Sequence, residues 1–334
     1  MTETAPAHAA AIPAGAGVLP GLADFDVEVP PPDLSPWQPG NVGLPGVISH
    51  AGPRPGPHVA LVSLVHGNEY AGAIVLDRLL RQGLGQGMGP ACGRLTCIFA
   101  NLSAFSLFDP GQPTASRFID EDLNRVWDID VLEGPRVSAE LSRARELRPL
   151  IDTVDILLDL HSMLWPSEPL MLCGTTAKGR AMARRIGVPG LVVADAGHSS
   201  GRRLMDYGGF SERASHRCAN LIEAGQHWQP DTVAITHAAV TALLHETGLQ
   251  PLPASQPQAA SSKVADVTHT INAITAGFAF VRQFRGGEVI AERNTLIAVD
   301  GMAEIRTPYD NCLLVMPSLR PSRGHTAVRL ARFD

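Results

Sequence analysis

The chain has 334 residues, which is enough for one large domain or for one domain with a smaller companion. Hydrophobic residues make up 45% of it, as expected for a globular protein with a substantial core. The formal net charge of -6 gives no general attraction to nucleic acid or to anionic lipid, so an anionic substrate has to be bound by local arginines.

The cysteines and the apolar segments exclude further classes. Five cysteines at irregular spacings, without a Cys-x-x-Cys pair, argue against a disulfide framework and against a thiolate zinc site. No apolar run is long enough to span a bilayer, and the N-terminus lacks the basic start and apolar block of a signal peptide. We therefore expect a soluble, cytoplasmic protein that binds neither membranes nor nucleic acid.

The N-terminal quarter changes from irregular to regular structure. Residues 1–26 are rich in alanine, proline and glycine and are expected to form a flexible tail, and residues 27–57 are expected to be extended and turn-rich. The run from Val59 to Val65 is apolar and β-branched, which predicts a strand buried on both faces. Apolar residues at helical spacing then predict a helix from Glu69 to Leu84.

The alternation of strand and helix continues along the chain. Strands are predicted at residues 95–100, 155–160, 169–173, 191–194 and 219–222, and helices at residues 138–150, 176–186 and 231–245. Asp231 is the predicted N-cap of the last helix, and Gly248 is its predicted stop. The pattern indicates an α/β domain over residues 27–250, with a mainly parallel or mixed sheet flanked by helices.

The composition changes after residue 250. Residues 251–262 are rich in proline, serine, glutamine and alanine, which is typical of a linker. Residues 263–334 contain short alternating segments divided by glycine pairs and prolines. They predict a small C-terminal all-β domain without helices.

Two of the predicted strands lead into side chains that can bind a metal ion. One strand runs directly into His66 and Glu69, which lie three positions apart across a turn at Gly67, and another ends at His161. Ligand sites gather at strand ends in open α/β sheets. Two histidines and one carboxylate with an open fourth position describe a catalytic zinc site, so we expect one Zn²⁺ per chain.

A charged segment from Arg117 to Arg125 lies between these metal-binding segments. Arginine binds a carboxylate through two parallel hydrogen bonds, and Asn124 offers both a donor and an acceptor. The segment therefore suits a substrate with a free carboxylate. A charged surface loop with internal ion pairs is an equally good reading of these residues alone.

Together these segments resemble the succinylglutamate desuccinylase/aspartoacylase family, a branch of the zinc-carboxypeptidase-like hydrolases. The resemblance implies a zinc-carboxypeptidase-like mixed sheet with a small C-terminal β domain, and an activity that removes the acyl group from an N-acyl amino acid. The matching pieces occur in the family's order and are His66-Gly-Asn-Glu69, Arg117 through Arg125, Asp159-Leu-His161 and Ile222-Glu-Ala-Gly225.

The resemblance also implies catalytic and binding roles. Glu223 would be the general base that activates the zinc-bound water and later protonates the leaving amine. Arg117 would polarise the scissile carbonyl, and Asn124 and Arg125 would bind the carboxylate of the amino acid.

Further residues would support or extend this site. Asp122 and Asp159 would orient arginine or histidine partners. Family members often use another arginine shortly before the base, and Arg213 and Arg217 are both candidates. Members specific for aspartate derivatives recruit a tyrosine from the C-terminal domain, for which Tyr309 is a candidate.

The expected function is zinc-dependent hydrolysis of the amide bond of an N-acyl amino acid. The alternative is a metallocarboxypeptidase acting on a short peptide, because it would share the metal and the base. A non-catalytic zinc-binding protein is a third hypothesis, although every residue type that catalysis needs is present. The acyl group, the amino acid and assembly into a homo-oligomer are left open by the sequence.

Overall fold

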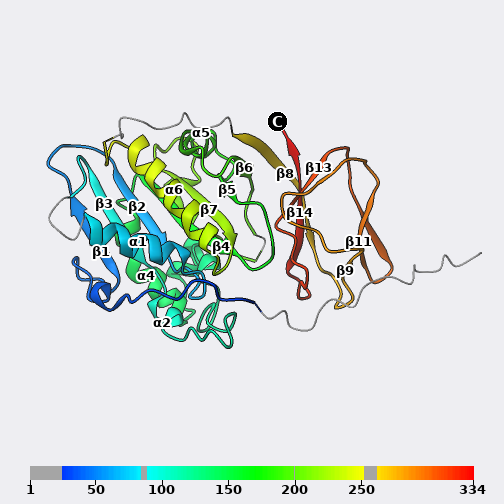
Figure 1. The fold of residues 1–334 in the computed structure, drawn as a ribbon, viewed down its shortest axis with the longest axis horizontal. Coiled ribbons are helices and arrows are strands. Elements are labelled where there is room, and N and C mark those ends of the chain that lie inside the picture. Colours follow the sequence, from blue (N-terminus) through cyan, green and yellow to red (C-terminus); the bar gives the residue numbers. More distant parts are fainter. Residues whose placement is uncertain (1–24, 84–88, 199, 252–261) are drawn as a thin grey trace, which may run out of the picture.

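The computed structural model describes residues 25–83, 89–198, 200–251 and 262–334 (Figure 1). All but two residues of the predicted tail (1–26) and all but two of the predicted linker (251–262) lie outside these ranges. The main helices are α1 (Ala71–Gln82), α2 (Leu102–Phe105), α3 (Ile129–Glu133), α4 (Ala139–Ile151), α5 (Ala177–Ile186) and α6 (Pro230–Glu246). The strands are β1 (Val47–Ala51), β2 (His58–Ser63), β3 (Arg94–Phe99), β4 (Ile156–Met163), β5 (Leu170–Leu172), β6 (Leu191–Ala194), β7 (Cys218–Gln226), β8 (Lys263–Asn272), β9 (Ala279–Phe280), β10 (Val289–Ile290), β11 (Leu296–Asp300), β12 (Ala303–Arg306), β13 (Cys312–Val315) and β14 (Thr326–Phe333).

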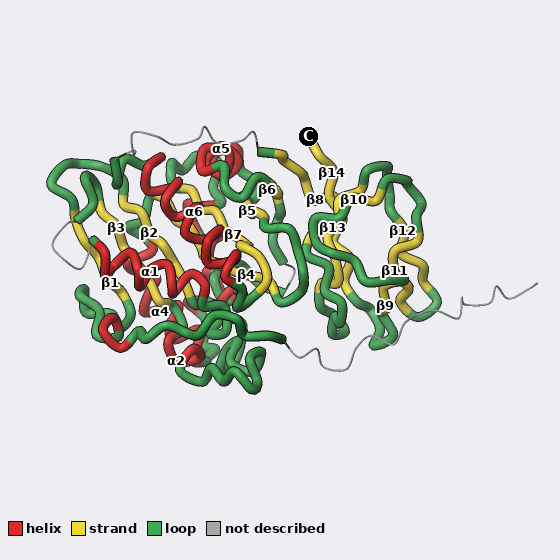
Figure 2. Tube along the Cα trace, viewed as in Figure 1, coloured by secondary structure: helices red, strands yellow, loops and turns green. Residues whose placement is uncertain are grey.

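A large mixed sheet is the framework of the molecule (Figures 1 and 2). Eleven strands follow the order β1-β3-β2-β4-β7-β5-β6-β8-β14-β13-β10, and β12, β11 and β9 form a second small sheet. Strands β3, β2, β4 and β7 are parallel neighbours, whereas β5 runs antiparallel to β7. The predicted fold class, a mixed α/β sheet flanked by helices with a C-terminal all-β part, is confirmed.

Helices cover both faces of the sheet because its central strands are apolar on both sides. In β2, Val59 and Leu61 pack into a core cluster with α1, α5 and α6, whereas Ala60 and Val62 pack into the opposite cluster with α4. Successive side chains of a strand point to opposite faces, so a continuous apolar run buries both. Among the described residues, no helix has the length and apolar character needed to cross a membrane.

Three details differ from the sequence-based expectation. The lead-in over residues 27–57 contains β1, which pairs antiparallel with β3 and is an edge strand of the sheet. Strands β4 and β7 are longer than predicted, so that His161 and Glu223 lie inside them. The prediction of Asp231 as N-cap is wrong, because α6 begins at Pro230 and Asp231 falls within its first turn.

The C-terminal strands extend the main sheet. Strand β8 pairs in parallel with β6, with Leu191 opposite Lys263, and β14, β13 and β10 follow it outward. Backbone hydrogen bonds therefore join the part before residue 250 to the part after residue 263. The division into a catalytic domain (27–250) and a small β domain (263–334) stays a prediction.

Candidate metal centre and active site

The candidate site lies at the carboxyl ends of three neighbouring parallel strands, β2, β4 and β7. His66 follows the end of β2, His161 lies near the end of β4, and Glu223 is the partner of His161 in the register of β7. Because parallel strands end at the same edge of a sheet, residues far apart in the sequence meet there.

His66, Glu69 and His161 form one compact buried group. Each exposes 4% or less of its surface, and they offer ligand atoms that lie within 4.8 Å of one another. The Nδ1 atom of His66 is 2.8 Å from Oε1 of Glu69, and Nδ1 of His161 is 3.0 Å from Oε2 of the same carboxylate. The predicted ligands therefore converge from two strand ends and one turn.

In each of the two histidines, the Nε2 atom lies beside a second carboxylate. Nε2 of His66 lies 2.9 Å from Asp122, and Nε2 of His161 lies 3.0 Å from Asp159. Metal-binding histidines are commonly oriented in this way, with one nitrogen toward the metal and the other toward a carboxylate. Nδ1 of His66 is buried and makes no hydrogen bond within the described part of the chain, so the three residues fit a divalent cation such as Zn²⁺.

Close packing explains the glycine between His66 and Glu69. A Cβ atom on Gly67 would lie 2.5 Å from backbone atoms of Ala104 and of Ser116, closer than real contacts allow. The Gly67 N–H also donates to the Arg117 carbonyl at 3.0 Å. The absent side chain thus lets the metal-binding turn lie directly against the segment that carries Arg117.

The buried charges of the metal-binding group stabilise one another. Burial opposes the charge on Glu69, but the two neighbouring imidazoles hold the pKa of Glu69 well below its ordinary value. Burial likewise opposes the charge on His161, but Asp159 and Glu69 raise the pKa of His161 well above its ordinary value. A bound cation would take the place of that imidazole proton.

Glu223 is a buried carboxyl beside this group. Burial, followed by the charge of Glu69, raises the pKa of Glu223 to about 8, and its Oε2 atom is buried without a hydrogen-bond partner in the described structure. Directly after it the β4–β7 register shifts, and Gly225 has a φ of +137°. A carboxyl that titrates near neutral pH can both accept and donate a proton.

Arg117 reaches the group from the segment between the metal-binding strands. Its Nη1 donates to Glu69 Oε1 at 2.8 Å, its Nη2 lies 3.5 Å from Asp122, and the side chain is 37% exposed. The guanidinium is thus fixed at the metal site and still open to a ligand. It is well placed to donate to a carbonyl oxygen bound there.

Glu140 on α4 anchors this segment and is not among the residues selected from the sequence. Its carboxylate accepts hydrogen bonds from the N–H groups of Ile119, Asp120 and Glu121, and from the Asn101 side chain. Burial opposes its ionisation, but these hydrogen bonds lower the pKa of Glu140. A buried helix carboxylate therefore fixes the chain just after Arg117.

Asn124 and Arg125 also lie at the site, with part of their bonding capacity in use. The Asn124 side-chain oxygen accepts from Leu204 N–H at 2.8 Å, and its Nδ2 lies 3.5 Å from Nε2 of His161. Arg125 donates to the Asn124 carbonyl at 2.8 Å and lies 3.7 Å from Asp122. Only the donor end of the Asn124 amide is therefore left for a ligand.

The remaining arginine and tyrosine candidates make other contacts. Arg217 donates to the carbonyls of Ile151 and Val154, before the start of β4, at the opposite end from His161. Arg213 is exposed. The Tyr309 hydroxyl lies 2.6 Å from Thr268 Oγ1, and its ring is covered by the Arg332 guanidinium.

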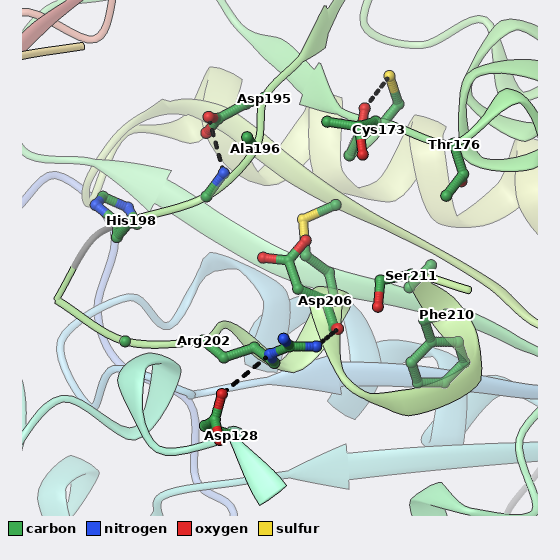
Figure 3. Close-up of a pocket in the computed structure, with 16 residues that line it drawn as sticks. Asp128, Cys173, Thr176, Asp195, Ala196, His198, Arg202, Asp206, Phe210 and Ser211 are labelled. Carbon is green, nitrogen blue, oxygen red and sulfur yellow. Dashed lines mark hydrogen bonds and ion pairs between the residues drawn. The ribbon is translucent and has the colours of Figure 1, made fainter. Parts of the chain in front are cut away.

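A cavity of about 390 Å³ lies beyond the end of β6, and none of the predicted site residues lines it (Figure 3). Asp195 and His198 lie on one side of it, and Arg202 lies on the other, where it pairs with Asp128 at 3.5 Å. Asp195 also forms ion pairs with two buried arginines, Arg203 and Arg329. Asp195 and His198 were not selected from the sequence because no motif marks them.

The family comparison identifies one match. The model of the succinylglutamate desuccinylase/aspartoacylase catalytic domain matches residues 55–246, which is more than half of the chain. This stretch includes His66, Glu69, Arg117, His161 and Glu223. A comparison with curated protein sequences finds no match.

Solved structures share the fold at low sequence identity. Succinylglutamate desuccinylase from Vibrio cholerae is 18% identical, with a TM-score of 0.67 and 86% of each chain covered. The corresponding protein from Vibrio parahaemolyticus is 18% identical, with a TM-score of 0.66 and the same coverage. The product-bound ectoine utilization protein EutE (DoeB) from Ruegeria pomeroyi is 17% identical, with a TM-score of 0.60, over 85% of this chain and 87% of that one.

Proposed function

Since this chain belongs to the succinylglutamate desuccinylase/aspartoacylase family, we propose that it hydrolyses the amide bond of an N-acyl amino acid with the help of one Zn²⁺ per chain. The observation that carries the proposal is the buried group of His66, Glu69 and His161 with Glu223 directly beside it. The names of similar structures, succinylglutamate desuccinylase among them, suggest which N-acyl compounds to test first.

Each residue of the site then has a chemical task. Zinc, when bound, would lower the pKa of a coordinated water and polarise the substrate carbonyl. Glu223 accepts the proton of the attacking water and passes it to the leaving amine, and its buried Oε2, which has no hydrogen-bond partner among the described residues, is available for this transfer. The bond between carbonyl carbon and nitrogen breaks, a bond from that carbon to the water oxygen forms, and a carboxylate and a free amine result.

The arginines and Asn124 position the substrate in this proposal. Arg117 donates to the carbonyl oxygen as negative charge develops on it, from a position already fixed by Glu69. The donor end of the Asn124 amide and the guanidinium of Arg125 bind the carboxylate of the amino acid.

Release of free amine from a panel of N-acetyl and N-succinyl amino acids tests this function. We expect zinc-loaded protein to release amine from at least one compound and chelator-treated protein to release none. Glu223→Gln should lower the rate by about 10²- to 10⁴-fold. Glu246→Gln, which removes a carboxylate that pairs with Arg185 on α5, is the matched control and should leave the rate unchanged.

The same panel separates the competing functions. Cleavage of dipeptides in preference to N-acyl amino acids would favour the metallocarboxypeptidase. Zinc binding without turnover of any compound, by folded protein, would contradict both hydrolase proposals and favour a non-catalytic zinc-binding protein.

The cytoplasmic location also stays a prediction, and assembly into a homo-oligomer stays open. All five cysteines are free thiols in the structure, as a reducing compartment would keep them. Fractionation of the producing cells and light scattering of the purified protein would test the location and the assembly.

A further inference from the structure

We propose that His227, just after β7, is a positioning residue of the metal centre that acts on Glu69 through Ser162. The inference rests on the proposed function, because Glu69 is one of the three proposed zinc ligands. It assigns a task to a buried histidine that is not itself a metal ligand.

Two hydrogen bonds join His227 to β4. Nδ1 of its imidazole lies 2.7 Å from Oγ of Ser162, and its backbone N–H donates to the carbonyl of Met163 at 2.8 Å. Both the imidazole and the serine are buried, with 3% and 4% of their surface exposed. Since Ser162 directly follows the proposed ligand His161, His227 holds β4 beside the metal-binding group.

Ser162 in turn holds the carboxylate of Glu69. Its backbone N–H donates to Oε2 of Glu69 at 3.1 Å, and Nη1 of Arg117 donates to Oε1 at 2.8 Å. Among the described residues, the other partners of this carboxylate are Nδ1 of His66 and Nδ1 of His161. A bound cation would take both of these imidazole nitrogens, so Ser162 and Arg117 would then be the donors that orient the carboxylate.

A β-bulge brings His227 to this position. From Glu223 to Gln226, β7 has one residue more than the stretch of β4 with which it pairs. Gly225, inside the bulge, has a φ of +137°, a backbone conformation that favours glycine. Bulges re-aim the side chains around them, and this one precedes the turn of the chain that places His227 against β4.

The next residue, Trp228, has a conformation that a large side chain rarely adopts. Its φ is +62°, and the side chain is buried. Nε1 of the indole donates to the carbonyl of Asn68 at 2.9 Å, and the carbonyl of Trp228 accepts from the N–H groups of Glu28 and Val29. Since Asn68 directly precedes Glu69, the chain after β7 contacts both segments that supply the metal ligands. Backbone strain persists where the surrounding structure enforces it, and it is concentrated at functional sites.

His227 adds no charge to the metal-binding group. Burial lowers the pKa of His227 to about 4, so the imidazole is neutral at physiological pH. A neutral imidazole has one N–H and one acceptor nitrogen, and a serine hydroxyl can pair with either. The hydrogen bond therefore orients Ser162 and leaves the charge balance of the site unchanged.

The alternative is that His227 only supports the fold. A purely structural residue would lower the free energy of unfolding and leave the zinc affinity of the folded protein unchanged. A positioning residue changes that affinity, because a misplaced Glu69 binds the cation less well. The zinc affinity is therefore the decisive measurement.

Chelator competition on the folded full chain measures the zinc affinity. We expect His227→Leu, which cannot bond to Ser162, to weaken zinc binding by about 10- to 100-fold, and Ser162→Ala to do the same. The double variant should bind zinc no more weakly than either single variant, since both changes remove the same hydrogen bond. His227→Asn should restore most of the affinity, because its side-chain amide places a polar atom where Nδ1 lies.

His58→Leu is the matched control variant. His58 on β2 is also buried, and its Nε2 lies 2.8 Å from the hydroxyl of Thr96 on the neighbouring strand β3. It lies at the opposite end of β2 from His66. We expect His58→Leu to lower the free energy of unfolding and to leave the zinc affinity within about twofold of the wild type.

An unchanged zinc affinity in His227→Leu, or an equal loss in His58→Leu, would overturn the proposal. A double variant in which the two losses add would also overturn it. The visible spectrum of Co²⁺-loaded protein gives a second measurement, because it reports the arrangement of the ligands. We expect this spectrum to change in His227→Leu and to stay the same in His58→Leu.

Neither measurement needs turnover, which separates this proposal from the proposed function. A wild type that binds zinc and hydrolyses no N-acyl amino acid contradicts the proposed function, while the zinc affinities still decide the role of His227. If His227→Leu does not fold, Ser162→Ala takes its place, because it removes the same hydrogen bond from the other partner.

Discussion

Replacing Glu223 by glutamine should stabilise the metal-free protein at pH 8 and leave its stability at pH 5 nearly unchanged. Burial, together with the charge of Glu69, raises the pKa of Glu223 from an ordinary 4.5 to about 8 in the folded chain. Between these values the folded state keeps a proton that the unfolded state has released. The stability of the wild type therefore falls as the pH rises, and the variant does not share this loss.

The two pKa values set the size of the effect. By linkage, a carboxyl with a pKa of 4.5 unfolded and about 8 folded costs about 4 kcal/mol at pH 8, where half of the folded molecules carry its charge. The entropy of unfolding grows with chain length. For 334 residues, this free energy corresponds to an increase in Tm of about 6 °C in the variant.

Thermal unfolding of chelator-treated wild type and variant at several pH values between 5 and 8 measures the effect. Glu246→Gln serves as the control, since it changes a partly exposed, paired carboxylate on α6. Loading both proteins with zinc should reduce the difference, because a nearby cation favours the ionised carboxyl. A difference in Tm that stays flat across this range, or that favours the wild type at pH 8, would refute the description of Glu223 as a buried, protonated group.

Three further changes test the support of the metal site. Asp159→Asn should weaken zinc binding by about 10- to 100-fold in a chelator competition, because the carboxylate behind His161 is lost; an unchanged affinity would contradict its orienting role. Gly67→Ala should lower the free energy of unfolding by about 2–4 kcal/mol and weaken zinc binding, since its Cβ would meet backbone 2.5 Å away; urea unfolding that matches the wild type would show that the turn can shift. Glu140→Ala should lower the free energy of unfolding by about 2–4 kcal/mol in the same urea assay, because three backbone N–H groups lose their acceptor. It should also lower turnover, because Arg117 is no longer held in place. Full turnover would show that other contacts hold the segment.

Local sequence pattern was sufficient for the central fold. The strand before His66 was predictable because six of the seven residues from Val59 to Val65 are apolar, which is typical of a strand buried on both faces. Strand β1 was missed because its five residues include a serine and a histidine and lie among prolines and glycines. The pairing of β8 with β6 joins segments about 70 residues apart, and no local pattern encodes such a contact.

The site was predictable to the extent that its residues follow these patterned strands. His66, Glu69 and His161 come directly after or within them, so their convergence follows from parallel pairing alone. The partners of Glu140 and Arg329 are set by tertiary contacts instead. For Arg329 one signal was present, since this charged residue interrupts the apolar run from Ala327 to Ala331.

The sheet order has a practical consequence for anyone who wants to shorten this protein. The family match ends at residue 246 and begins at residue 55, yet β1, which borders β3, and β8, which borders β6, both lie outside it. Trimming the chain to the matched boundaries would expose the edges of β3 and β6, each with a row of unpaired backbone N–H and C=O groups. Exposed edge strands pair with strands of other molecules. The trimmed fragment is therefore expected to aggregate, even though it keeps every proposed zinc ligand.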